Sequence, residues 1–104
     1  MKHKDILDSR DRLAQHLPDP AQIVRGTLLR RTIRHARGCP KCRAGGGHPV
    51  WVLTVTYPGG RTRQFSIRPE QRAQVQQWVR NYQRLKEGLE AISELNHKLL
   101  RPSR

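Results

Sequence analysis

The feature that most constrains the fold is a regular apolar stripe over residues 70–100. Apolar side chains recur there in alternating steps of three and four from Val75 to Leu99, with Asn96 as a polar member. This spacing predicts one long helix that begins at Pro69-Glu70. About 30 helical residues span roughly 45 Å, which exceeds a sheet of short strands. The helix therefore needs a second packing partner along part of its length.

The first half of the stripe is expected to pack on a sheet and the second half to form a helix–helix interface. In heptad register Asn96 takes an a position, where a polar residue fixes the register of a two-stranded coil. Gly88 lowers helix propensity and indicates the close approach of another helix. The partner is either the N-terminal helix, a second copy of the chain or a larger protein. The residues expected at this interface are Leu85, Leu89, Ile92, Asn96 and Leu99.

Four shorter stretches precede the predicted long helix, and the last two have the clearest pattern. Residues 3–17 are amphipathic, with Ile6 and Leu13 on one face, and predict a short helix. Residues 22–35 are rich in β-branched side chains and arginine, and predict a strand that bends near Gly26. Residues 50–57 and 61–68 alternate in polarity around Pro58-Gly59-Gly60, the pattern of a β-hairpin.

Together these elements predict one small α+β domain over residues 1–104. A three-stranded antiparallel meander, within residues 22–68, lies between the short helix at 3–17 and the long helix at 70–100.

Both cysteines lie between the first two predicted strands, in the spacing H-x3-C-x2-C-x5-H. Zinc prefers thiolate and imidazole ligands, and a C-x2-C turn offers two sulfurs to one tetrahedral ion. We therefore predict a structural Zn²⁺ in a zinc-knuckle-like turn, with Cys39, Cys42, His48 and His35 as candidate ligands. Two free thiols and a redox dithiol remain as alternatives, although glycines follow the motif where a redox dithiol needs a helix start.

The charge balance indicates a polyanionic partner. Lys and Arg total 21 against 8 Asp and Glu, a formal net charge of +13, and most of the cations are arginines. Arginine binds phosphate in a bidentate manner and stacks on bases, so nucleic acid is the expected partner. The alternative is a solvated basic surface, which the clustering of these residues disfavours. The candidate contacts are Arg25, Arg30, Arg31, Arg34, Arg37, Lys41, Arg43, Arg61 and Arg63.

DNA is favoured over RNA, since a two-fold dimer with basic ribbons would suit duplex DNA. Stacking on single strands is expected to be weak, because the chain has only five aromatic residues and most are assigned to the core.

Catalysis is not expected. Seven of the eight carboxylates lie in predicted helices, and no phosphate-binding glycine loop precedes a Lys-Ser or Lys-Thr pair. A Cys42–His48 nucleophile pair stays open, but a metal site explains the same residues. No apolar run is long enough to span a membrane, and the polar N-terminus lacks a signal peptide, so a cytoplasmic protein without membrane association is expected.

Several short motifs resemble a family of small uncharacterised prokaryotic proteins with a domain of unknown function, often found beside transposase genes. The resemblance covers residues 24–99 and implies a mobile-element or nucleic-acid setting. Family members carry three cysteines followed by His-Gly-Pro, whereas Ala44 takes the third cysteine's place here and Gly47-His48-Pro49 is rearranged. The motifs are Gly26-Thr27-Leu28, the cysteine turn with His48, the Trp51–Tyr57 strand, Arg61-Thr62-Arg63, Asn81-Tyr82 and Glu94-Leu95-Asn96.

Two functions follow as hypotheses. The first is a nucleic-acid-binding accessory protein, probed by the salt dependence of binding. The second is an interaction subunit whose long helix dimerises or docks on a larger nucleic-acid enzyme.

Overall fold

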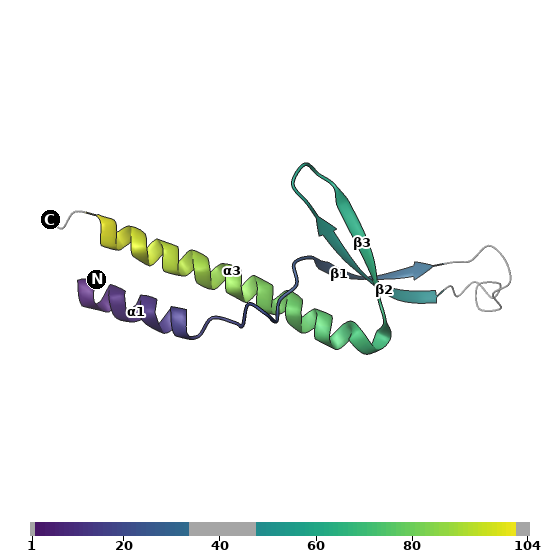
Figure 1. Ribbon diagram of the computed structural model, residues 1–104, viewed down its shortest axis with the longest axis horizontal. Coiled ribbons are helices and arrows are strands. Elements are labelled where there is room, and N and C mark those ends of the chain that lie inside the picture. The colour runs from purple at the N-terminus through teal and green to yellow at the C-terminus, as the bar shows by residue number, and fades with distance from the viewer. Residues whose placement is uncertain (1, 34–47, 102–104) are drawn as a thin grey trace. The chain divides into compact units, whose positions relative to one another are not determined.

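The computed structural model describes residues 2–33 and 48–101 (Figure 1). It has the predicted α+β architecture, with an N-terminal helix, a three-stranded sheet and a long C-terminal helix. The elements in chain order are α1 (His3–Gln15), β1 (Thr27–Ile33), β2 (His48–Thr56), β3 (Thr62–Ile67), the 3-10 turn η1 (Pro69–Gln71) and α3 (Arg72–Leu100).

The sheet is the predicted antiparallel meander, in the order β1-β2-β3. Leu53, at the centre of β2, pairs with Leu28 of β1 and with Phe65 of β3. Paired residues share a face of a sheet, so this register places the three side chains on one side. That face also carries Trp51 and Val55, as the alternation of the sequence predicts.

The first strand is shorter than the predicted span of 22–35, because it begins only at Thr27. The backbone N–H of Val24 donates to the carbonyl of Trp78 in α3 at 3.2 Å, so this residue is bonded to a helix and not to a strand. Gly26 then turns the chain with a φ of 150°. The bend predicted near Gly26 is therefore the start of the strand.

The hairpin turn between β2 and β3 is confirmed. Gly59 and Gly60 have φ values of 90° and 85°, a left-handed conformation that glycine adopts without steric cost. The N–H of Tyr57 donates to the Arg61 carbonyl at 2.7 Å and closes the loop. The ends of β2 and β3 are therefore held together directly beside Tyr57 and Arg61.

The long helix begins two residues later than the stripe predicts. Residues 69–71 form the 3-10 turn, in which the N–H of Gln71 donates to the Arg68 carbonyl at 2.9 Å. The Gln71 side chain bonds back, since its Oε1 accepts from the N–H of Arg68 at 3.3 Å. The polypeptide then continues as one helix to Leu100. No helix within the described ranges has both the length and the apolar character needed to cross a bilayer.

The described residues fall into two compact units, one within Met1–Ile23 and Arg80–Arg104 and the other within Val24–Val79. That the whole chain forms one domain stays a prediction.

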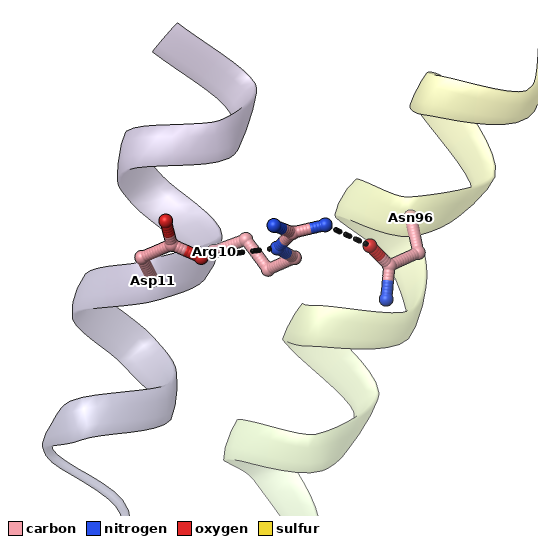
Figure 2. A network of polar contacts seen from close by, with 3 residues as sticks. All are labelled: Arg10, Asp11 and Asn96. Carbon is pink, nitrogen blue, oxygen red and sulfur yellow. Dashed lines mark hydrogen bonds and ion pairs between the residues drawn. The ribbon is translucent and has the colours of Figure 1, made fainter. Parts of the chain in front are cut away.

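The first unit is an antiparallel helix pair, in which α1 runs beside the C-terminal part of α3 (Figure 1). Figure 2 shows the polar contact between them: Arg10 Nη1 donates to Asn96 Oδ1 at 3.4 Å, and Arg10 Nε lies 3.2 Å from Asp11 Oδ1. Ile6 is the buried residue of α1. The stripe of α3 therefore has a partner within the chain.

The close approach expected at Gly88 is present, but the neighbour is not a helix. A Cβ placed on Gly88 would overlap Leu17 Cδ2, and Leu17 lies two residues beyond the end of α1.

The second unit contains the sheet, and its buried core is Val52, Leu53 and Val55 of β2. Because β2 is the central strand, its side chains are flanked on both sides.

Candidate nucleic-acid interface

The net positive charge is concentrated in the unit Val24–Val79, because this unit holds almost no carboxylate. This segment holds 11 of the 21 Lys and Arg residues but only one of the eight carboxylates. That carboxylate, Glu70, lies 3.5 Å from Arg68 Nε, and both side chains are largely exposed. Exposed pairs of this kind are weak and leave the surrounding charge in place. The sheet unit therefore carries most of the protein's net positive charge.

Three of the predicted contact arginines come together at the end of the hairpin. Arg25 lines a pocket with Tyr57 and Phe65, and Arg61 and Arg63 line an adjacent pocket that also includes Tyr57. We call Arg25, Tyr57, Arg61, Arg63 and Phe65 the hairpin-end cluster. The antiparallel register creates it, because β3 returns beside the end of β2 and the segment before β1 reaches the same place.

Arg25 is held in place by two contacts. Its Nη1 donates to the carbonyl of Thr56 at 2.6 Å, and its guanidinium carbon lies 5.3 Å from the centre of the Tyr57 ring. The second distance is that of a cation–π interaction. A guanidinium has five N–H donors, so one bond to Thr56 leaves others for an anion.

Arg63 and Arg61 complete the cation cluster. The guanidinium carbon of Arg63 lies 5.5 Å from the centre of the Phe65 ring. Phe65 follows Arg63 by two residues in β3, so both side chains are on the same face. Arg61 is anchored through its backbone carbonyl, which accepts from Tyr57. All three arginines are exposed. The cluster thus combines fixed positive charge with aromatic rings.

Arg30 and Arg31 do not form one basic surface, because consecutive strand residues face opposite ways. Arg30 pairs with Trp51, whereas Arg31 pairs with Val50 on the other face. There Arg31 Nη1 donates to Gln64 Oε1 at 3.5 Å. In β2, Val52 lies between Val50 and Thr54, which are the strand partners of Arg31 and Gln64 on the same face. The contact between Arg31 and Gln64 therefore passes over Val52, which is 6% exposed. Arg31 therefore covers part of the core.

Four other predicted contacts, Arg34, Arg37, Lys41 and Arg43, lie outside the described residues.

The predicted metal ligands Cys39, Cys42 and His35 also lie outside the described residues. His48 begins β2 and pairs with Ile33, the last residue of β1. The segment that contains both cysteines therefore starts and ends at adjacent backbone positions. Within residues 2–33 and 48–101, no group of three or more His, Cys, Asp or Glu side chains could hold a metal ion.

The residues of the predicted helix interface differ in how exposed their side chains are. Leu85, Ile92 and Leu99 are half-buried, and Asn96 accepts the bond from Arg10 of α1. Leu89 differs from them, since it is 52% exposed. The N-terminal helix thus contacts one part of the predicted interface, at Asn96, whereas about half of the Leu89 side chain stays exposed.

The sequence prediction missed the aromatic members of the site. Besides Tyr57 and Phe65, Trp51 pairs with a cation, because the Arg72 guanidinium carbon lies 4.6 Å from the centre of its ring. Spacing could have indicated one such pair, since Arg63 and Phe65 stand two apart in a strand and share a face. The other two depend on tertiary contacts.

Comparison with known proteins gives one family. A model of a domain of unknown function, DUF6788, matches residues 3–77, which includes α1, the sheet and the start of α3. No curated protein and no solved structure matches the chain. The match covers more than half of the residues, and the chain therefore belongs to the DUF6788 family.

Proposed function

We propose that this protein is a small nucleic-acid-binding accessory protein, without catalytic activity, whose sheet unit carries the contact surface. The supporting observation is the excess of ten positive charges within Val24–Val79, set against an excess of three in the rest of the chain. DNA remains the first expected target, and the cytoplasmic, mobile-element setting remains a prediction.

The hairpin-end cluster supplies the chemistry for this role. Its three exposed arginines lie around two pockets, and no carboxylate is among the residues that line them. Cations that neutralise phosphates release condensed counterions, so the affinity falls steeply as salt rises. Arg25 and Arg63 are also held against aromatic rings, which reduces the side-chain entropy that binding would cost.

The test is binding to duplex DNA, single-stranded DNA and structured RNA of equal length across a salt series. We expect a linear fall of log K with log salt for at least one polymer, with a slope of roughly −0.7 to −0.9 per neutralised phosphate. Weak binding that is indifferent to salt and to polymer would contradict the proposal.

A structural zinc ion at the cysteine turn belongs to the same proposal. The pairing of Ile33 with His48 supports it, because this pairing brings the two ends of the cysteine-containing segment together. Cys39 and Cys42, with His48 and His35, would hold the ion, and their thiolate and imidazole groups suit Zn²⁺. The same salt series on metal-loaded and chelated protein tests whether zinc supports binding.

The second candidate function is an interaction subunit. The exposure of Leu89 favours it, since this residue lies on the predicted interface and is 52% exposed. Ile6 is the one buried residue that the described helix pair contains, so a second copy of the pair would supply burial that two helices lack. A homodimer through α3 is therefore the form of this candidate that we propose.

A further inference from the structure

One aromatic side chain of the hairpin-end cluster, Phe65, is exposed to solvent and not buried in the core. Phe65 is 38% exposed and lies on β3, which is an edge strand of the described sheet. The guanidinium of Arg63 lies over its ring. An exposed ring beside a cation is accessible to a ligand at the surface.

Phe65 lines a pocket within the sheet unit. The pocket has a volume of about 440 Å³, and its other aromatic members are Tyr57 and Trp78. This volume is in the usual range for ligand pockets, about 300–1,000 Å³. Of the nine lining residues, Arg25 alone carries a charge. The pocket therefore suits a flat, apolar group that is attached to an anion.

The charges around the pocket define the occupant more closely. Arg25 lines it, and Arg63 is held over the ring of one of its lining residues, Phe65. Two cations beside a pocket lined by three aromatic residues match a nucleotide unit, in which a planar base is flanked by phosphates on both sides. Among the side chains that commonly read base edges, no amide or carboxylate lines the pocket, and its one guanidinium, Arg25, already donates to the Thr56 carbonyl.

We propose that an unpaired base of single-stranded DNA enters this pocket and stacks on Phe65, while Arg25 and Arg63 contact the flanking phosphates. This inference rests on the proposed nucleic-acid binding and names the form of its target. It departs from the weak stacking expected from the sequence, because three of the five aromatic residues line this one pocket. Bases in a duplex are stacked on one another and do not reach such a pocket without extrusion, so single strands bind more tightly than duplexes. Binding tolerates every base, because stacking uses the ring face.

The test compares an oligo(dT) strand with an abasic strand of the same length. The two probes have equal phosphate charge, so purely electrostatic binding treats them alike. We expect the wild-type protein to bind oligo(dT) roughly 5- to 150-fold more tightly, the range for one stacked base. In Phe65→Ala this ratio should approach one.

The chain offers a matched control. Leu29 has the same 38% exposure as Phe65 but lies on the opposite face of the sheet, because it pairs with Val52. Leu29→Ala should keep the preference for oligo(dT). Phe65→Leu is the second variant, since it keeps an apolar side chain without the ring. It should also lose the preference, provided that circular dichroism shows the wild-type fold.

The outcomes separate the inference from the proposed function. Salt-dependent binding of equal strength to both strands would overturn the inference and leave the proposed nucleic-acid binding intact. A preference that survives in both Phe65 variants would also overturn it. If neither strand, nor duplex DNA nor RNA, binds in a salt-dependent way, both proposals fail.

Discussion

At the scale of single residues, the site depends on arginines whose positions are set by contacts with this chain. Arg25 is fixed by Thr56 and Tyr57, whereas Arg31 is bonded to Gln64. The two side chains have the same chemistry, but their surroundings assign different tasks to them. Arg31 contributes to the cover of Val52, and Arg25 is directed to a pocket. A basic residue in the sequence is therefore not by itself evidence of a nucleic-acid contact.

Gly26 allows the first residue-scale prediction, which concerns stability. Gly26→Ala forces a left-handed φ on alanine and places its Cβ 2.9 Å from both Leu53 Cδ1 and the Thr54 carbonyl oxygen. The carbonyl is backbone and cannot move aside easily, so we expect a loss of about 1–3 kcal/mol in the free energy of unfolding, measured by urea denaturation.

Gly59→Ala is the matched control for this variant. Gly59 also has a positive φ, but nothing lies within 4 Å of the added Cβ. It should cost less than Gly26→Ala. Equal losses for the two variants would show that the crowding at Gly26 has no energetic effect.

At the scale of elements, local patterns predicted the helices and the hairpin well. The stripe of α3 and the alternation of β2 and β3 are periodic over many residues, and periodicity depends only on the neighbouring sequence. The start of β1 was predicted wrongly, because the bond from Val24 to Trp78 joins residues that are far apart in the chain. The arginines of the hairpin-end cluster were predicted as contacts, but their grouping with Tyr57 and Phe65 was not, for the same reason. The membership of the cluster depends on the register of β2 with β3, and a shift of one residue would move Phe65 to the other face.

The helix pair gives the element-scale prediction. Leu89→Glu adds charge to the exposed part of the stripe, so we expect it to abolish self-association in sedimentation equilibrium with little change in stability. Ile6→Ala instead removes the buried residue of α1 and should lower the free energy of unfolding by about 2–5 kcal/mol.

A dimer that persists in Leu89→Glu would contradict the proposed use of α3. So would a wild-type protein that remains monomeric at every concentration tested.

At the scale of the whole molecule, most of the net positive charge and the helix pair belong to different parts of the chain. The unit Val24–Val79 has a large excess of positive charge, whereas seven of the eight carboxylates lie in the rest of the chain. A protein whose charge served only general solubility would have no reason to place its carboxylates in one part. This asymmetry, with the arginines of the hairpin-end cluster, is the basis of the proposed nucleic-acid binding.

The most direct measurement compares two double variants that remove the same charge from different units. Arg61→Gln/Arg63→Gln changes the hairpin-end cluster, and Arg80→Gln/Arg84→Gln changes two exposed arginines of α3 in the helix-pair unit. We expect the first variant to weaken binding to single-stranded DNA and to reduce the slope of log K against log salt by about 1.4, which corresponds to two lost phosphate contacts. The second variant should keep nearly the wild-type slope. Equal effects from the two variants would show that only net charge matters, and would contradict a contact surface on the sheet unit.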